Sequence, residues 1–499
     1  MNLRAIRWLL GNLALLIALA LLAPAAVSSY AGEGEVVRGF LVAALVAAGL
    51  GVVLMVGARG SLRTPEGRPT FFLREGLAVV ALAWLLAGVV GATPFLLAGA
   101  TDSWNKALFE SVSGFTTTGA TIFTAEEVDR LPMGVAFWRA LTHWVGGIGI
   151  VVLFVALLPT GGRSLFRSEA REAEGARVHD AALALVRIYV GLTGAHVIAL
   201  WLAGVGLFDS ITHAFSTMAT GGFSNHGASV AFFGSPLVEG IVIVFMILAG
   251  TNFAFWRELL SHGPRRGFER IRRSTELRLY LGLLAGGSLF LTLVLWFWGG
   301  SNGAEGVDLP DYSSFLLCLR HATFNLVSIQ TCTGYATADF DRWPDTCRFL
   351  LMTLAFVGGC AGSTAGGIKV VRLAVIARAS IAAVRSFARP RAVVRVSLDG
   401  ENLDDSSVSS VARYVILWIL AAICGSLALT VCGVGLTEAV TSVVSCLNNV
   451  GPGLGAVGPA GDYGHLSGAA RLVLCVVMIA GRLEFYALIA LFLPDLWRR

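Results

Sequence analysis

The stretch NLVSIQTCTGYATADF, residues 325–340, decides the fold of this chain. It carries Thr331, Thr333 and Gly334, and a long apolar stretch lies on each side of it. Threonine and glycine clustered in this way predict an irregular loop whose backbone groups are not all paired. If the flanking stretches cross a membrane, such a loop is tolerated only where protein buries it or where it lines a water-filled cavity.

The composition is that of an integral membrane protein. The 499 residues are 56% hydrophobic and 14% charged, with a mean hydropathy of +0.75, whereas globular domains are about 45–50% apolar and about 25% charged. A spanning helix needs roughly 20 apolar residues, and such stretches recur along the whole chain. We predict ten spanning segments, near residues 9–29, 37–57, 76–99, 134–158, 181–206, 236–254, 279–299, 346–386, 410–434 and 468–493.

Basic residues predict the orientation, because they occupy the N-terminus, every second loop and the C-terminus. They are Arg4 and Arg7; Arg59, Arg63, Arg68 and Arg74; Arg163, Arg167, Arg171 and Arg177; Arg265, Arg266, Arg270, Arg272 and Arg273; Arg378, Arg385, Arg389, Arg391 and Arg395; and Arg498 and Arg499. The opposite loops are nearly uncharged or acidic, as at Glu305, Asp308 and Asp311. The positive-inside rule then predicts a multi-pass protein with both termini in the cytoplasm. The net charge of +5 reflects this topology and gives no reason to expect a nucleic-acid partner.

The first apolar segment resembles a signal peptide, with a basic start and a small-residue end. Its apolar run is longer than the roughly 7–15 residues of a signal-peptide core, so we expect a retained helix.

Three further stretches repeat the pattern of the opening one. They are ESVSGFTTTGAT (residues 110–121), AFSTMATGGFS (residues 214–224) and SVVSCLNNVGPGLG (residues 442–455). In all four, the same offset separates a serine from a glycine: Ser113 and Gly119, Ser216 and Gly222, Ser328 and Gly334, Ser445 and Gly451. A single copy would be an ordinary turn between helices, but four copies with one spacing indicate an internal repeat.

Each repeat predicts the same local structure: an apolar span, a short semi-polar segment, a loop and a second span. A dozen helical residues rise only about 18 Å, too little to cross a membrane, so the short segment must enter and return on the same side. The fold class is therefore an all-α membrane protein with four pseudo-repeated helix/pore-helix/helix units around one central pore, preceded by two extra N-terminal transmembrane helices. The predicted divisions are 1–68 for the helix pair, then 69–165, 166–265, 266–395 and 396–499 for the repeats.

Four such loops around one axis predict an ion pore. Rings of backbone carbonyls can replace the hydration shell of a potassium ion, and glycine permits φ > 0 while keeping bulk off the axis. A membrane-embedded enzyme would need a convergent nucleophile, base and oxyanion site, whereas the polar residues here are spread over four loops. A secondary transporter with a midplane site usually shows a twofold inverted repeat.

The predicted span 346–386 is too long for one crossing and contains GGCAGSTAGG, residues 358–367. Small and flexible residues are poor helix formers, so we expect the helix to open into a loop, ended by Lys369, that obstructs the cytoplasmic half of the pore. The alternative is a kinked helix that uses small residues to approach a neighbour.

Arg482 lies within the last predicted span. An arginine at the bilayer centre costs at least about 2.5–3.5 kcal/mol, so it should face the bundle interior or a cavity. Facing the pore, it would repel cations. The alternatives are a pair with Glu484 or a carbonyl, or snorkelling toward the inner face.

With these residues in view, the sequence resembles the Trk/Ktr/HKT superfamily of potassium transporters, and within it the bacterial TrkH-type subunit. The resemblance covers essentially the whole chain, including GGCAGSTAGGIKVVR (residues 358–372) and GRLEFYALIALFLPDLWRR (residues 481–499). It implies a potassium filter formed by four triplets: Thr117, Thr118 and Gly119; Thr220, Gly221 and Gly222; Cys332, Thr333 and Gly334; Asn449, Val450 and Gly451. It also implies a gate formed by Gly358, Gly359, Gly362, Ser363, Thr364, Gly366, Gly367, Lys369 and Arg482.

The same resemblance implies the setting in which the protein works. We expect potassium as the transported ion, with rubidium and sodium as further candidates, and no bound cofactor or catalytic residue. We expect a homodimer in the bacterial inner membrane, controlled by cytoplasmic TrkA-type subunits that bind nucleotide. The fourth loop departs from the pattern, with asparagine and valine where the first has threonine, which puts strict potassium selectivity in doubt.

The patterns around the remaining polar residues indicate structural roles and no proton-transfer, ion-attracting or metal-binding role. His143 and His196 lie in predicted spans without acidic partners, Glu110 is a lone carboxylate near the outer mouth, and the eight cysteines show no metal-binding spacing.

Overall fold

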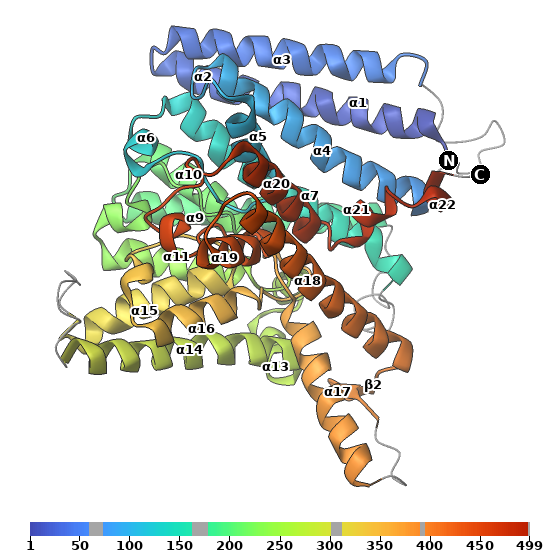
Figure 1. Cartoon of the computed structure of the whole chain (residues 1–499), viewed down its shortest axis with the longest axis vertical. Coiled ribbons are helices and arrows are strands. Elements are labelled where there is room, and N and C mark those ends of the chain that lie inside the picture. The colour runs from blue at the N-terminus through green and yellow to red at the C-terminus, as the bar shows by residue number, and fades with distance from the viewer. Residues whose placement is uncertain (59–72, 162–177, 301–311, 390–394, 498–499) are drawn as a thin grey trace.

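The computed structural model describes residues 1–58, 73–161, 178–300, 312–389 and 395–497, and nearly every described element is an α-helix (Figure 1). The described strands are β1 (Ser397–Leu398) and β2 (Glu401–Asn402), which pair antiparallel. Part of the charge pattern used for the orientation lies outside the described residues: Arg59, Arg63, Arg68, Arg163, Arg167, Arg171, Arg177, Arg391, Arg498, Arg499, Glu305, Asp308 and Asp311.

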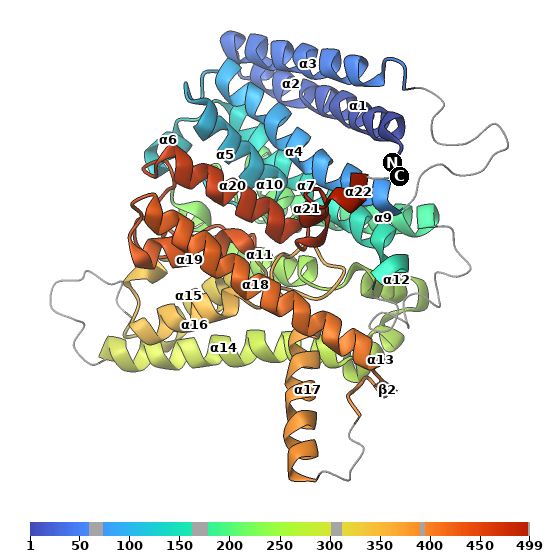
Figure 2. The same ribbon diagram turned by 45° about the vertical axis from the view of Figure 1, so that its right-hand side comes forward.

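The two predicted N-terminal helices form a hairpin on one side of the molecule (Figures 1 and 2). Its first arm comprises α1 (Leu3–Ala20) and α2 (Leu22–Tyr30), which together form one apolar stretch of 28 residues, and its second arm is α3 (Gly34–Met55). Small residues allow the hairpin to pack closely against the next helix, α4 (Leu73–Leu97), as is usual for helices in membranes. A β-carbon added at Gly39 would lie 2.4 Å from the carbonyl oxygen of Leu97.

The four repeats follow in order, each with a first helix, a short pore helix and a second helix. The first helices are α4 (Leu73–Leu97), α9 (Val178–Leu202), α14 (Thr275–Gly300) and α18 (Asp405–Val431). The pore helices are α5 (Trp104–Phe115), α10 (Leu207–Met218), α15 (Phe315–Gln330) and α19 (Leu436–Leu447). The second helices are α7 (Met133–Gly161), α11 (Pro236–Ala249) with α12 (Phe253–His262), α16 (Asp345–Ala355) with α17 (Val370–Ala388), and α20 (Gly468–Arg482) with α21 (Tyr486–Ala490).

Short elements join these parts: α6 (Ala125–Asp129), α13 (Pro264–Arg273), α22 (Pro494–Trp497), and the 3₁₀ turns η1 (Ser229–Phe233), η2 (Phe340–Arg342) and η3 (Gly455–Val457).

Contacts between the repeats close a ring. The second helix of each repeat packs against the pore helix of the next, as α7 on α10, α11 on α15, α16 on α19 and finally α20 on α5. Because the last contact returns to the first repeat, the four pore helices surround a common centre. This arrangement confirms the predicted fold class.

Three of the four second helices are broken. The predicted span 346–386 is interrupted as expected, since α16 ends at Ala355 and α17 starts at Val370. The predicted spans 236–254 and 468–493 are also broken, which the sequence pattern does not predict. By length and composition alone, six described helices can cross a membrane, or seven if α11 and α12 count as one span despite a bend of 98°.

Local chemistry explains where two of these breaks fall. The side chain of Asn252 accepts a hydrogen bond from Ala254 N at 2.8 Å, and such a cap starts a new helix. After Arg482, Glu484 and Phe485 take left-handed φ angles of 51° and 66°, which end a right-handed helix. The residues around both breaks are largely apolar, so hydropathy does not reveal them.

Gly39 offers a test of the N-terminal packing. Substituting Gly39→Ala places a β-carbon against the backbone of Leu97 and Ala98, and overpacking of this kind typically costs about 1–3 kcal/mol. We expect a lower midpoint of thermal unfolding in detergent. Gly49 is the matched control, because it lies on the same helix and a β-carbon there would meet nothing within 4 Å. Equal midpoints for the two variants would contradict the packing.

Candidate functional site

The four predicted filter triplets share one unusual backbone conformation. Their first residues, although not glycines, are left-handed: φ is 54° at Thr117, 54° at Thr220, 59° at Cys332 and 55° at Asn449. Their third residues are left-handed glycines, with φ of 77° at Gly119, 80° at Gly222, 82° at Gly334 and 107° at Gly451. Left-handed residues other than glycine are uncommon, so four copies at equivalent positions indicate a shared structural requirement.

The constant spacing between serine and glycine has a backbone cause. The N–H of the middle residue of each triplet donates to the carbonyl of the serine: Thr118 to Ser113 at 2.9 Å, Gly221 to Ser216 at 2.8 Å, Thr333 to Ser328 at 2.8 Å and Val450 to Ser445 at 2.9 Å. These bonds fasten each loop to the last turn of its pore helix. They use only main-chain atoms, so they explain the spacing and leave the choice of serine unexplained.

The triplets meet around one axis in cyclic order. A β-carbon added at Gly119 would lie 2.0 Å from the carbonyl oxygen of Gly221, at Gly222 it would lie 2.0 Å from that of Thr333, at Gly334 2.0 Å from that of Val450, and at Gly451 2.8 Å from that of Thr118. Each loop therefore lies against the next, and the fourth returns to the first. The sequence-predicted triplet residues are brought together into one ring.

Most carbonyl oxygens of the triplets receive no hydrogen bond from the part of the chain that the structure describes. Among the residues that the structure describes, none donates to the carbonyls of the first three triplets, and in the fourth triplet only Gly451 accepts a bond, from the Tyr463 hydroxyl at 2.8 Å. Buried carbonyls without partners are costly. A ring of them is suited to hold a cation whose hydration water has been removed.

Side-chain differences between the loops also have local causes. In the first and third loops the middle threonine bonds to an earlier threonine, Thr118 to Thr116 and Thr333 to Thr331, each at 2.8 Å. In the second loop this position is Gly221, where a β-carbon would lie 2.4 Å from Nδ1 of His143. His143 is thus a packed residue, stacked on Phe223 with ring centroids 4.1 Å apart, as its lack of acidic partners predicted. His196 likewise stacks on Phe245 at 4.2 Å.

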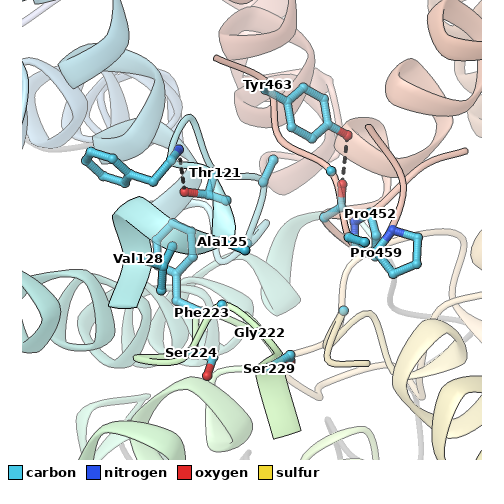
Figure 3. Close-up of a pocket in the computed structure, with 18 of the residues that line it drawn as sticks. Thr121, Ala125, Val128, Gly222, Phe223, Ser224, Ser229, Pro452, Pro459 and Tyr463 are labelled. Atoms are coloured by element: carbon cyan, nitrogen blue, oxygen red, sulfur yellow. Dashed lines mark hydrogen bonds between the residues drawn. The ribbon is translucent and has the colours of Figure 1, made fainter. Parts of the chain in front are cut away.

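A cavity of about 90 Å³ opens on one side of the ring (Figure 3). The four glycines at the third position of the triplets line it, together with Arg139, His226 and Tyr463 from the surrounding loops and helices. The cavity lies on the side of the loops that follow the pore helices, which the predicted topology assigns to the exterior. It forms a direct approach to the carbonyl ring.

Glu110 and Arg139 form a buried ion pair behind the first two loops. Nε of Arg139 donates to Glu110 at 2.8 Å, and the carboxylate also accepts from Ile122 N at 2.9 Å. Arg139 further donates to the Ser224 carbonyl at 3.0 Å, so the pair ties the first repeat to the second. Glu110 is 0% exposed and does not face the outer mouth. Sequence reasoning missed Arg139, although an arginine inside a predicted span is itself a signal.

The interrupted segment, residues 356–369, lies on the other side of the ring. Its ends are paired, because Gly358 N donates to Ile368 O at 3.0 Å and Ile368 N to Phe356 O at 3.1 Å. Thr364 Oγ1 donates to the carbonyls of Met218 at 3.0 Å and Ala249 at 3.3 Å. The first of these carbonyls belongs to the last residue of pore helix α10, immediately before the second loop.

The predicted gate residues therefore gather at the ends of the pore helices. A β-carbon at Gly366 would lie 2.1 Å from the carbonyl oxygen of Asn448, next to the fourth triplet. Gly358, Gly359, Gly362, Ser363 and Thr364 are buried in the same segment. Lys369 is 9% exposed and its ammonium folds back to donate to Ala365 O, so it does not reach toward solvent.

Arg482 joins three repeats. Its guanidinium donates to the Thr364 carbonyl at 2.8 Å and to the Gly146 carbonyl at 3.4 Å, and the residue is 2% exposed. Of the alternatives predicted from the sequence, bonding to a carbonyl is therefore present, whereas the pair with Glu484 does not form, because Glu484 bonds to Arg372. Snorkelling is also excluded by the burial. Arg482 thus anchors the interrupted segment to the first and fourth repeats.

Comparison with known proteins shows full-length similarity. The sequence profile of the TrkH family, described as a cation transport protein, matches residues 45–300 and 310–498. The chain is 36% identical over 510 residues to the Trk system potassium uptake protein TrkH of Escherichia coli (strain K12), and 36% identical over 516 residues to that of Halomonas elongata, covering 100% of each chain. The crystal structure of the potassium transporter TrkH from Vibrio parahaemolyticus matches with a TM-score of 0.88 at 33% identity, again over 100% of both chains.

The buried ion pair gives a stability test of the site. Glu110→Ala leaves Arg139 charged, buried and without its carboxylate, and breaking such a pair costs about 3–5 kcal/mol. We expect a clear drop in the midpoint of thermal unfolding in detergent. Glu35→Ala is the control, because its pair with Arg38 is 92% and 79% exposed and exposed pairs contribute about 0–1 kcal/mol. An unchanged midpoint for Glu110→Ala would contradict the role of the pair.

Proposed function

The chain belongs to the TrkH family of cation transport proteins, and on this premise we propose that it transports potassium ions through the ring formed by the four triplets. It is a transport protein, as its relatives are, and not an enzyme. Relatives named as potassium uptake proteins support potassium as the ion. The observation that carries the proposal is the closed ring of carbonyls to which the described residues offer almost no donor.

Selection in this ring rests on replacing water. A potassium ion entering from the outer cavity exchanges its hydration shell for carbonyl oxygens of the triplets, which then bind it as the ring of a potassium channel does. The left-handed backbone turns successive carbonyls toward the axis, and glycine leaves room for the neighbouring loop. Potassium is the transported substrate here, and the site has no resident cofactor.

The interrupted segment and Arg482 act in this proposal as the gate. The segment fills the space beneath the ring, and Arg482 fixes it through hydrogen bonds to Thr364 and Gly146. A buried guanidinium also repels cations, and this repulsion is strong where little water screens it. Conduction then requires the segment to move and the arginine to leave the pathway.

Regulation and assembly extend the proposal. Helix α17 follows the gate directly and projects from the body of the molecule (Figures 1 and 2), so a partner that moves α17 would move the gate. We assign this role to cytoplasmic TrkA-type subunits that bind nucleotide. We further propose a homodimer in the bacterial inner membrane with cytoplasmic termini, and repeats divided at residues 68, 165, 265 and 395.

Gly334 tests the filter. Gly334→Ala adds a β-carbon 2.0 Å from the Val450 carbonyl oxygen, which must displace a loop at a typical cost of about 1–3 kcal/mol. We expect the ratio of rubidium to sodium uptake in proteoliposomes to fall by about tenfold, equivalent to about 1.4 kcal/mol. Gly282→Ala, on α14 with nothing within 4 Å, is the control. If Gly334→Ala keeps the wild-type ratio, the ring does not select the ion.

Arg482 tests the gate. Arg482→Ala removes the bonds to Thr364 and Gly146 together with the buried charge, and hydrogen bonds from charged groups contribute about 1.5–3 kcal/mol each. We therefore expect basal rubidium uptake by the purified protein to rise about tenfold or more. Arg385→Ala, on the exposed part of α17, should behave as wild type. Unchanged or lower uptake in Arg482→Ala would indicate a purely structural anchor.

A further inference from the structure

Each triplet loop packs against the next, and we call the contact between two neighbouring loops a seam. The seam between the fourth and first loops differs from the other three. The added β-carbon would lie 2.8 Å from the facing carbonyl at Gly451, against 2.0 Å at Gly119, Gly222 and Gly334. Gly451 also has the largest φ of the four, 107°. It alone precedes a proline, Pro452, which restricts the backbone of the residue before it. The backbone closes this seam less tightly than the rest.

Tyr463 bridges this seam. It lies in the loop between η3 and α20 and is 2% exposed. Its hydroxyl donates to the Gly451 carbonyl at 2.8 Å (Figure 3). Its backbone N–H donates to the Thr121 carbonyl at 2.8 Å. Its ring packs against Phe109 of pore helix α5, with centroids 5.4 Å apart. One residue thus contacts the fourth loop, the first loop and the first pore helix.

Asn449 makes a second bridge across the same seam. Its side-chain Nδ2 donates to Thr118 Oγ1 at 3.0 Å and to the Met478 carbonyl at 3.1 Å. Thr118 in turn bonds to Thr116. The equivalent hydroxyl in the third loop, Thr333, contacts Thr331, and among the described residues no side chain from a neighbouring loop bonds to it. The cross-loop bond therefore belongs to the loose seam.

We infer that Tyr463 and Asn449 are positioning residues that set the specificity of the ring for potassium over sodium. The inference rests on the proposed function of the ring. The spacing between the fourth and first loops is fixed by two side-chain bridges, because the backbone alone leaves it open. Tyr463 also holds the Gly451 carbonyl, the one triplet oxygen with a described donor. Without these bridges the width of the ring varies. Its carbonyls then discriminate less between potassium and sodium.

Reversal potentials test the inference, with potassium on one side of a planar bilayer and sodium on the other. Tyr463→Phe removes only the hydroxyl, and Thr118→Val removes the acceptor of the Asn449 bond. A hydrogen bond contributes about 0.5–1.5 kcal/mol, so we expect sodium permeability relative to potassium to rise about two- to tenfold in each variant. If a variant yields less folded protein, the current falls but the reversal potential stays unchanged.

Three further variants sharpen the experiment. Thr118→Ser keeps the hydroxyl and should restore the wild-type reversal potential. Thr333→Val should shift it less than Thr118→Val, because no described side chain from a neighbouring loop bonds to Thr333. Tyr312→Phe should keep the wild-type reversal potential, because the Tyr312 hydroxyl bonds to Trp343, away from the ring.

The result for the wild type separates this inference from the proposed function. A wild-type protein without preference for potassium overturns both. A selective wild type whose Tyr463→Phe and Thr118→Val variants keep its reversal potential overturns the role of the bridges alone.

Discussion

The structure depends on one constraint: a backbone carbonyl inside a membrane needs a partner. The triplets expose their carbonyls by alternating left-handed residues, and the described residues supply almost no donors for them. Four copies can exist at membrane depth only if they share one polar axis, and in the proposed function a dehydrated cation supplies the missing partner. The ring of second helices on pore helices, the main-chain bond from each loop to its serine and the close packing at the glycines all serve to bring these oxygens together.

Buried charged side chains also destabilise this fold unless they are paired, and different partners hold each of them. Glu110 and Arg139 neutralise each other and fasten the first loop to the second. Buried Glu239 pairs across the second and third repeats with Arg320, whose side chain is 28% exposed and whose Nε lies 2.6 Å from the carboxylate. Arg482 differs from these two pairs, because the partners that the described residues offer it are carbonyls alone. A charge that is buried without a counter-ion is costly to keep, which is consistent with the movement of Arg482 in the proposed gate.

Much of this arrangement was predictable from the sequence, because it depends on the spacing of particular residues along the chain. The serine-to-glycine offset reflects the main-chain bond at the end of each pore helix, and a run such as GGCAGSTAGG is a poor helix former. The breaks after Ala249 and Arg482 were not predictable from hydropathy, since their cause is a capping side chain in one case and left-handed residues in the other. The bridge from Tyr463 was missed for a different reason: its partners lie in another repeat, and a lone tyrosine in a loop has no pattern.

The carbonyl ring can be tested directly by crystallising the protein with rubidium or thallium and measuring anomalous scattering. Density is expected on the axis between the carbonyls of Thr118, Gly221, Thr333 and Val450, next to the outer cavity. An empty axis, with the heavy ion bound elsewhere, would contradict the claim that these oxygens replace the water around a transported cation.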